Sequence, residues 1–315
     1  MSTSTRMNDK EENMKIGIDL GGSHIGIGLI ENNEILILKE RNFNREDREN
    51  LKENIIKYIE IMISEILTEK NIKINDVELI GIASPGTIAN GIIEKAENLK
   101  LEKFDLCGIL KEKYNIPIII RNDAKAAGLA EKKYGAMKEF DDCVFLTIGT
   151  GIGGAAFMGG KLLEPKRFSG FEFGHMVLNK GGRLCACGKK GCFESYASIR
   201  ALKMQVTKDL DIDSDITGQY LREKLLIKQD PVVQDDIELF LDYLKTGICN
   251  LIDIFEPEVV CLGGSFAYYE GNPILDRLLE KINAPESSFN HNNKPKIVLA
   301  EYKNNAGIIG ATIQN

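Results

Sequence analysis

Residues 15–30 read KIGIDLGGSHIGIGLI. Two runs rich in isoleucine flank a short turn at Gly21, Gly22 and Ser23, and this pattern predicts a β-hairpin. A Rossmann turn needs a strand followed by a helix, and a P-loop needs a G-K-[ST] ending, so the stretch argues against both. Glycines in such a turn let backbone N–H groups approach a phosphate closely. The stretch therefore predicts a phosphate-facing hairpin, with an ordinary solvated hairpin as the alternative.

Asp19 stands at the end of the first predicted strand, directly before this turn. A carboxylate near phosphates is repulsive unless a cation lies between them. Asp19 is therefore a candidate to position Mg²⁺, through bound water.

Residues 144–158, VFLTIGTGIGGAAFM, repeat the pattern of β-run, glycine turn and β-run, with Gly149, Thr150 and Gly151 in the turn. The two segments read as a weak internal duplication, in which each half supplies one phosphate-facing hairpin. Such a pair predicts two similar lobes that face one nucleotide. The arrangement resembles the actin-like (ribonuclease H-like) and hexokinase-like ATPases, which implies a two-lobed α/β fold that binds ATP.

A second cluster lies in residues 170–198, GFEFGHMVLNKGGRLCACGKKGCFESYAS. His175, Cys185, Cys187 and Cys192 follow the pattern H-x9-C-x-C-x4-C. Three thiolates and an imidazole suit tetrahedral Zn²⁺, and a set with no ligand missing suits a structural site. The alternative is a chance cluster of three reduced cysteines in one loop.

Two acids flank the cluster: Glu172 precedes His175 by three residues, and Glu194 follows Cys192 by two. A rigid loop with acids at both ends is well placed to hold a polyhydroxylated ligand. The runs E-x-G-H and C-x-C-G-x-x-G-C-x-E resemble the signature of the ROK family, which contains sugar kinases, with glucokinase the common member, and sugar-responsive repressors. The resemblance covers residues 15–315.

The segment Arg121-Asn122-Asp123-Ala124 follows a predicted buried strand (116–120) and precedes an alanine-rich helix (124–134). It is similar to the family segment N-D-A-N-A-A, with Lys125 in place of the second asparagine. The resemblance implies that Asp123 is the catalytic base and that Asn122 binds the sugar. The chemistry needs such a base, because a sugar hydroxyl must lose its proton as it attacks the γ-phosphorus of ATP. A helix cap is the alternative role for Asp123.

The resemblance assigns three further residues. Asn98, after a predicted strand at 77–83 and the turn Ser84-Pro85-Gly86-Thr87, would meet a sugar hydroxyl, with a simple turn as its alternative role. Gly263 and Gly264, after a predicted strand at 259–262, would lie near the adenosine of ATP, although this join is also common scaffolding. His175 would bind Zn²⁺ with one ring nitrogen and a sugar hydroxyl with the other. Glu172 and Glu194 would orient further hydroxyls.

The remaining pattern completes the predicted architecture. Residues 46–70 predict a helix, because apolar residues recur at helical spacing. Other predicted elements are strands at 34–39 and 296–300, a helical region at 196–255 and a short closing helix at 306–313. The predicted domains are a disordered tail (1–13), a smaller N-terminal lobe (14–122 with 301–315) and a larger lobe with the zinc loop and sugar site (123–300).

Composition narrows the class of protein. The 315 residues, 43% of them hydrophobic, suffice for two domains with their own cores. The net charge of −7 without a basic block argues against nucleic-acid binding, and no apolar run approaches the length of a membrane span. Residues 1–13 lack the apolar core of a secretory signal. Cys107, Cys143, Cys249 and Cys261 lie in apolar surroundings, which fits buried thiols in a reducing cytoplasm.

The resemblance implies an ATP-dependent hexokinase-type sugar kinase, with glucose O6 as the favoured acceptor because the intact E-x-G-H and the short gap between His175 and Cys185 fit the glucokinase pattern. Kinases of N-acetylmannosamine, N-acetylglucosamine, allose or a β-glucoside remain alternatives, as does polyphosphate as donor. A non-catalytic sugar-sensing regulator is the alternative of another class. About 14 polar residues before Lys15 are too few for a helix-turn-helix domain, which favours the kinase branch. A homodimer or homotetramer is expected.

Overall fold

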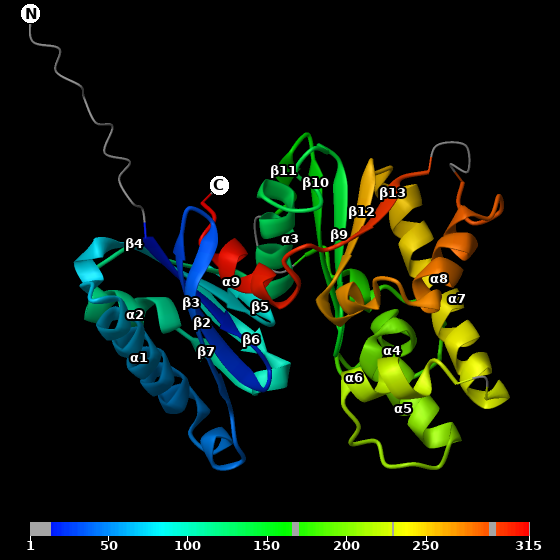
Figure 1. The fold of residues 1–315 in the computed structure, drawn as a ribbon, viewed down its shortest axis with the longest axis horizontal. Helices are drawn as coiled ribbons and strands as arrows, with labels where there is room; N and C mark the ends of the chain where they lie inside the picture. The colour runs from blue at the N-terminus through cyan, green and yellow to red at the C-terminus, as the bar shows by residue number, and fades with distance from the viewer. Residues whose placement is uncertain (1–13, 166–169, 229, 290–293, 315) are drawn as a thin grey trace, which may run out of the picture.

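The computed structural model describes residues 14–165, 170–228, 230–289 and 294–314. The predicted disordered tail, 1–13, lies outside the described residues. Two five-stranded sheets stand beside one another, each covered by its own helices (Figure 1). The mixed α/β class predicted from the two hairpins is confirmed. None of the described helices combines the length and the hydropathy needed to cross a bilayer.

The first sheet has the strand order β3-β2-β1-β4-β8. The β1–β2 and β2–β3 pairs are antiparallel, whereas β4 pairs in parallel with both β1 and β8. Its strands are β1 (Met14–Leu20), β2 (His24–Glu31), β3 (Glu34–Asn42), β4 (Val77–Ser84) and β8 (Ile118–Asn122). Asp19 and Asn122 thus lie at the carboxyl ends of parallel strands, where the ligand sites of such sheets are found.

The second sheet repeats this plan in the order β11-β10-β9-β12-β13. Here too an antiparallel hairpin, β9–β10, is followed by two parallel strands. The strands are β9 (Cys143–Ile148), β10 (Ile152–Met158), β11 (Lys161–Leu162), β12 (Val259–Gly263) and β13 (Lys296–Leu299). The matching orders explain why the two hairpin segments resemble one another in sequence.

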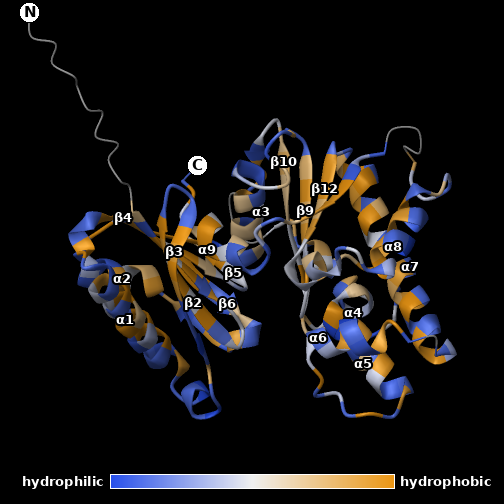
Figure 2. Cartoon of the chain, in the orientation of Figure 1, coloured by the Kyte–Doolittle hydropathy of each residue, from blue (hydrophilic) through white to orange (hydrophobic). Residues whose placement is uncertain are grey.

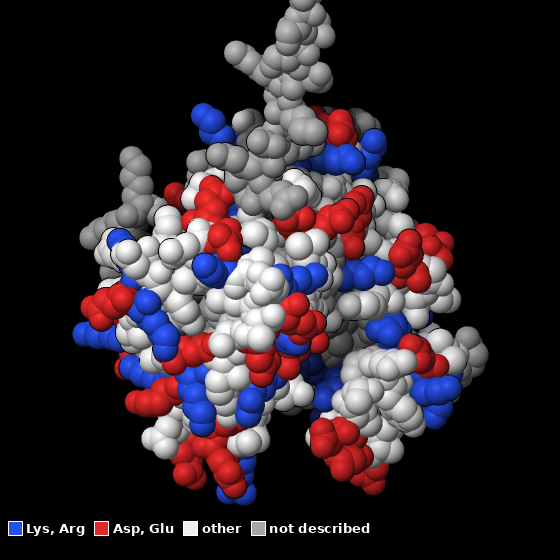
Figure 3. Space-filling view, turned by 60° about the vertical axis from the view of Figure 1, so that its left-hand side comes forward, with Lys and Arg blue, Asp and Glu red and all other residues white. Residues whose placement is uncertain are grey.

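Helices cover the outer faces, and the apolar residues gather in the central strands of both sheets (Figure 2). The first sheet is covered by α1 (Leu51–Lys70) and α2 (Leu106–Tyr114). The second lobe carries α4 (Glu194–Ala197), α5 (Ile199–Asp209), α6 (Gly218–Tyr220), α7 (Pro231–Phe255) and α8 (Pro273–Asn283). Charged side chains of both signs are interspersed over the face drawn in Figure 3.

The predicted helix at 46–70 is wrong at its start, because α1 begins at Leu51. Residues Glu46–Arg48 form a separate 3₁₀ turn, η1. The carboxylate of Asp47 accepts hydrogen bonds from the Asn44 N–H and from the Tyr58 hydroxyl, which fixes this turn against the side of α1. Side-chain capture of the backbone is a common reason for a helix to start late.

A third, small sheet was not predicted. It contains β5 (Thr87–Ala89), β6 (Ile92–Ala96) and β7 (Leu101–Phe104). The 3₁₀ turn η3 (Glu97–Leu99) joins β6 to β7 and carries Asn98. The other short turns of the described chain are η2 (Ile74–Asp76), η4 (Phe173–His175), the π-turn η5 (Leu221–Leu225), η6 (Gly264–Tyr269) and η7 (Lys303–Asn305).

Two helices, α3 (Asp123–Lys133) and α9 (Ala306–Ala311), pack against each other between the sheets (Figure 1). Helix α3 contacts strands of both sheets, while α9 lies on β1 and β4. Glycine makes this packing possible: a Cβ at Gly310 would overlap the Ala126 carbonyl, and one at Gly81 would overlap the Ala311 carbonyl. The proposed lobe boundaries at residues 122 and 300 fall directly before α3 and before the segment that leads to α9, and they stay a prediction.

Candidate functional site

A pocket of about 770 Å³ opens between the two sheets, at the carboxyl ends of their parallel strands. Its volume is in the range of small-molecule sites. The predicted site residues that line it are Gly22, Ser23, Asn98, Asn122, Asp123, Gly149, Thr150, Gly151, Glu172, His175 and Glu194. Residues from five separate stretches of sequence therefore meet at one cavity.

Of the residues predicted for the sugar and the nucleotide, Asp19, Gly21, Gly263 and Gly264 are not among those that line the pocket. Gly21 lies one residue before the lining residue Gly22, and its N–H bonds the His24 carbonyl at 2.9 Å. Gly264 has a φ of +65°, and a Cβ there would lie 2.6 Å from the Thr147 hydroxyl. Close packing on β9 therefore accounts for the glycine at position 264 without a ligand. The nucleotide role of Gly263 and Gly264 stays a prediction.

The carbonyls of the first hairpin turn are bonded to residues that do not line the pocket. Ser23 O accepts a hydrogen bond from the Phe43 N–H at 2.8 Å. Gly22 O accepts one from Nη2 of Arg48 at 2.9 Å. In a trans peptide the N–H points opposite to the C=O, so these two bonds direct the N–H groups of Ser23 and His24 to the other side of the turn.

Arg48 is a residue of interest that the sequence did not single out, because residues 46–70 were read as one helix. The Asp47 contacts to Asn44 and Tyr58 hold η1 in place, and the Arg41 guanidinium lies 3.8 Å from the Tyr58 ring centroid. These contacts hold Arg48 where it can bond the Gly22 carbonyl of the first hairpin turn. One feature of the sequence could have indicated a separate turn here. The polar run from Asn44 to Asp47, of the form N-x-x-D, lies directly before the apolar helix pattern.

Asp123 lies at the pocket end of α3, at the point where β8 passes into the helix. Asn122 is the N-cap: its side-chain oxygen accepts from the Ala124 N–H at 3.1 Å and from the Lys125 N–H at 3.3 Å. The Asn122 amide also donates to Gly86 O at 3.2 Å. Oδ1 of Asp123 also accepts from the Ala124 N–H, at 2.8 Å, so Asn122 is the N-cap and Asp123 shares one of its two N–H donors.

Burial raises the pKa of Asp123 to about 7, and the nearby negative charge of Asp19 adds to the shift. Burial likewise raises the pKa of Asp19 to about 6, with a further contribution from Glu40. Two carboxyls that repel each other in a dry site are the arrangement expected of a general base beside a cation site. Asp19 lies against α9, since a Cβ at Gly307 would be 2.9 Å from its carboxyl carbon.

The acids of the second lobe belong to the loop that packs on β10. A Cβ at Gly174 would overlap the Ile152 carbonyl, so glycine is required for the close approach of η4 to the strand. One carboxylate oxygen of Glu194 accepts from the Ile152 N–H at 3.0 Å. Burial raises the pKa of Glu172, against the opposing charges of His175 and Lys125. Lys125, the residue that departs from the family segment, lines the same pocket.

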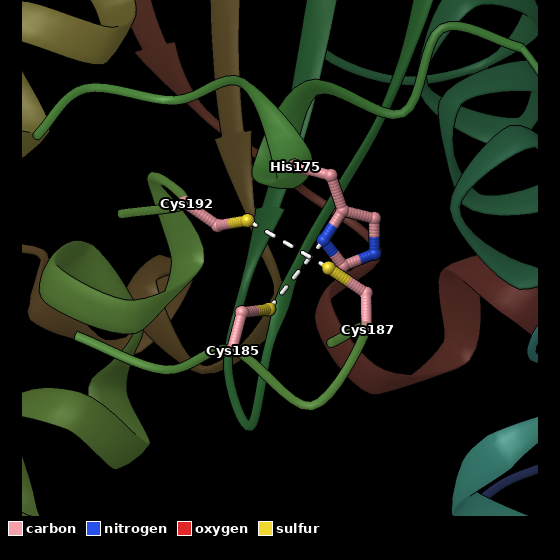
Figure 4. A group of neighbouring side chains, drawn as sticks. All are labelled: His175, Cys185, Cys187 and Cys192. Atoms are coloured by element: carbon pink, nitrogen blue, oxygen red, sulfur yellow. Dashed lines mark hydrogen bonds between the residues drawn. The ribbon is translucent and has the colours of Figure 1, made fainter. Parts of the chain in front are cut away.

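The four predicted metal ligands come together, with one ligand atom from each within 4.8 Å of every other (Figure 4). Nδ1 of His175 lies 3.7 Å from Sγ of Cys185, and Sγ of Cys187 lies 3.7 Å from Sγ of Cys192. With zinc–sulfur bonds near 2.3 Å and zinc–nitrogen bonds near 2.1 Å, tetrahedral geometry gives ligand separations of roughly 3.6–3.8 Å. The donor set and its spacing therefore fit Zn²⁺.

The loop is shaped to hold these ligands. Gly188 and Gly191 have φ values of +84° and +87°, which other residues adopt at a cost. A Cβ at Gly191 would also overlap the Asn179 carbonyl. The Nζ of Lys189 donates to His175 O at 2.8 Å, which joins the two ends of the ligand set. The second ring nitrogen of His175 lies on the side away from the sulfur atoms, and the residue lines the pocket (Figure 4).

Comparison with known proteins gives a consistent result. The family described as "ROK family" matches residues 15–314. A glucokinase from Thermotoga maritima is 30% identical over 85% of this chain and 86% of its own. A xylose repressor from Caldicellulosiruptor bescii is 28% identical over 96% of this chain and 78% of its own. A ROK hexokinase from Thermus thermophilus has a structure with a TM-score of 0.77 and 30% identity, covering 95% of this chain and 96% of that one.

We expect the purified protein to contain about one zinc ion per chain. The Cys187→Ser variant should lose most of it, because three remaining ligands bind zinc weakly. Elemental analysis after extensive dialysis measures the content. Cys107→Ser is the matched control, since Cys107 lies outside the cluster. Equal zinc content in both variants would contradict the assignment.

Proposed function

The chain belongs to the ROK family, and from this premise we propose that it is an ATP-dependent sugar kinase that transfers the γ-phosphoryl group of ATP to O6 of glucose. The observation that carries the proposal is Asp123, a buried carboxyl with a pKa raised to about 7 in a pocket shared by both hairpin turns and by Glu172, His175 and Glu194. Acids that orient hydroxyls, a base and backbone donors for phosphate are the parts that sugar phosphorylation needs.

In the proposed reaction, Asp123 accepts the proton of the sugar O6 hydroxyl while that oxygen attacks the γ-phosphorus. The O–H bond and the bond between the γ-phosphorus and the bridging oxygen break, the new O6–P bond forms, and ADP leaves with the electron pair of the bridging oxygen. A base with a pKa near the working pH is well matched to this transfer. Its position at the start of α3 holds it rigidly.

The phosphate groups would lie against the two hairpin turns, whose N–H groups donate to the phosphate oxygens. Asp19 is the residue proposed to hold Mg²⁺, and its repulsion with Asp123 suits a site that a cation completes. Magnesium, when bound, neutralises charge on the phosphates. Gly263 and Gly264 are proposed to lie near the adenosine.

The sugar would be held from both sides of the pocket. Asn98 and Asn122 lie on the side of the first sheet, and Glu172, His175 and Glu194 lie on the zinc loop. Zinc, when bound by His175, Cys185, Cys187 and Cys192, would fix this loop and take no part in phosphoryl transfer. The Glu194 bond to the Ile152 N–H joins the loop to the second hairpin.

Similarity supports glucose as the first candidate acceptor, through the Thermotoga maritima glucokinase. N-acetylmannosamine is the second, because a Listeria monocytogenes protein described as a putative N-acetylmannosamine kinase matches with a TM-score of 0.76 and 28% identity over 95% of this chain and 97% of that one. A sugar-sensing regulator is the alternative from another class of protein, supported by the similarity to the xylose repressor.

We further propose that the protein acts in the cytoplasm, where its free cysteines stay reduced, and that it forms a homodimer or homotetramer.

We expect ADP release from Mg-ATP with one dominant sugar in a panel of glucose, mannose, fructose, allose, N-acetylglucosamine, N-acetylmannosamine and a β-glucoside. The Asp123→Asn variant should lose at least about 1,000-fold in kcat while it still binds the sugar, because the amide cannot accept the proton. A coupled assay and calorimetric titration with the sugar measure the two effects. Binding without turnover in the wild-type protein would favour the regulator instead.

The raised pKa of Asp123 has two consequences with pH. The value of kcat/KM should fall as the pH drops through about 7, because protonated Asp123 cannot act as a base. The folded protein should also lose stability as the pH rises from about 4 to about 7, because the unfolded chain ionises Asp123 more readily than the folded one.

Asp123→Asn should therefore raise the free energy of unfolding at pH 8 by about 1–3 kcal/mol and change it little at pH 4. Denaturant titrations at the two pH values measure this difference. An equal change at both values would mean that the carboxyl ionises normally.

The Arg48→Gln variant should raise the KM for ATP about three- to tenfold and leave the KM for sugar nearly unchanged, because the released Gly22 carbonyl is free to turn toward the phosphates. Arg45→Gln is the matched control, since Arg45 is exposed one turn earlier and caps no carbonyl of the hairpin. Steady-state kinetics with each substrate varied in turn separate the effects. A rise confined to the sugar KM would contradict the positioning role of Arg48.

A further inference from the structure

A second cavity, of about 190 Å³, lies at the opposite end of the α3–α9 pair from the pocket described above. We call it the rear cavity. Its polar lining comes from Lys15, Asn32, Asn33, Lys133, Tyr134 and Thr312. These residues belong to β1, to the β2–β3 turn, to the end of α3 and to the end of α9. The cavity is therefore built where the first sheet meets both α3 and α9.

The position of the rear cavity follows from the lengths of the elements. Lys15 precedes Asp19 by four residues of β1, a separation of about 13 Å along a strand. Lys133 follows Asp123 by ten residues of α3, a separation of about 15 Å along a helix. Helix α9 lies against Asp19 at Gly307 and reaches the rear cavity at Ile309. The same three elements thus connect one cavity to the other.

The lining of the rear cavity is cationic. Its described lining residues include two lysines and no Asp or Glu, in a chain whose net charge is −7. Among the described residues, neither Lys15 nor Lys133 has a carboxylate oxygen within 4 Å of its ammonium group, as is also true of most lysines of this chain. On the face drawn in Figure 3 the two signs are interspersed. What sets the rear cavity apart is that two ammonium groups line one small space, which is a feature of anion sites.

The size and the donors of the rear cavity narrow the class of anion. A volume of about 190 Å³ lies below the range of sites for drug-sized ligands, which begins at roughly 300 Å³. Asn32 and Asn33, both with positive φ in the hairpin turn, place two side-chain amides at the rim, and Thr312 adds a hydroxyl. A tetrahedral dianion can accept hydrogen bonds from all of these donors together.

We propose that the rear cavity binds a small phosphate-bearing dianion, either inorganic phosphate or the phosphoryl group of a small metabolite, and that this binding alters the angle between the two sheets. Lys15 moves with the first sheet, whereas Lys133 ends a helix that also contacts β9 and β10 of the second sheet. An anion held by both lysines favours the lobe arrangement in which they are closest. Binding therefore shifts the population toward that arrangement.

Isoleucine methyl groups offer reporters for each cavity. Ile30, Ile309 and Ile313 line the rear cavity, and Ile152 lines the large pocket. Ile254 is exposed on α7 and serves as a reference. In protein labelled at isoleucine δ1 methyls, titration with sodium phosphate against sodium chloride of equal ionic strength should shift the three rear reporters in a saturable way. Shifts confined to Ile152, or no saturable shift at the rear reporters, would overturn the proposal.

Two double variants test the role of the lysines. Lys15→Gln with Lys133→Gln should weaken the binding read at Ile309 and Ile313 at least tenfold. Lys111→Gln with Lys138→Gln makes the same charge change at exposed positions outside both cavities and should leave the binding unchanged. Equal weakening in both double variants would assign the effect to net charge and overturn the site.

The coupling has its own readout in the wild-type protein. One part of the Ile152 shift should depend on the rear cavity. This part should saturate at the same phosphate concentration as the shifts of the rear reporters, and it should vanish in the Lys15 and Lys133 double variant. Any direct binding of phosphate to the large pocket should remain in that variant. An Ile152 response identical in both proteins would overturn the coupling. Repeating the titration with glucose 6-phosphate distinguishes the two sources of the phosphoryl group by their relative affinities. Because no step of the test requires turnover, its result is independent of the proposed kinase activity.

Discussion

The close packing of α9 against α3 and the first sheet is the contact on which the rest of the structure depends. Glycines at 81, 307 and 310 remove the side chains that would hold these backbones apart. Helix α3 begins at Asp123, and α9 lies against Asp19, so this one contact fixes the separation of the two acids that matter most to the proposed reaction. Burial raises both pKa values; the charge of Asp19 adds to the shift at Asp123, and the charge of Glu40 adds to the shift at Asp19. The packing of α9 against α3 thus holds two carboxyls close enough to repel each other, as a general base beside a cation site requires.

The duplicated sheets would let one pocket hold both substrates of the proposed reaction. Each half contributes a hairpin turn, and the two turns lie on the same cavity. Only the second half adds the long loop with the Cys/His cluster after β11, and Glu194 ties that loop back to β10. The symmetric part of the fold therefore suits the phosphate groups, and the asymmetric part suits the sugar. In a family whose members include kinases and repressors, the loop is the part that a change of ligand would alter first.

The hairpins, the central strands and the metal cluster could be predicted from the sequence, because each depends on local spacing and strand ends, and most of the residues predicted for the sugar and nucleotide line the pocket. The small sheet β5–β7 and the true start of α1 at Leu51 could not be predicted, since they depend on contacts between distant segments. Arg48 was missed for the same reason: its value comes from reaching Gly22, 26 residues away. Gly264 shows why a glycine pattern is ambiguous: a glycine required for packing on β9 has the same sequence pattern as one that approaches a nucleotide, and the nucleotide role stays a prediction.

The rear cavity brings together the two ends of the described chain. Lys15, near the start of β1, and Ile313, just after α9, line the same small space. A domain joined to either end would therefore attach beside α3 and α9, on the side away from the ligand pocket. A module attached there would move whenever the angle between the two sheets changed. It would not cover the opening of the large pocket. Such an attachment would be compatible with either of the two proposed roles, kinase or sugar-sensing regulator.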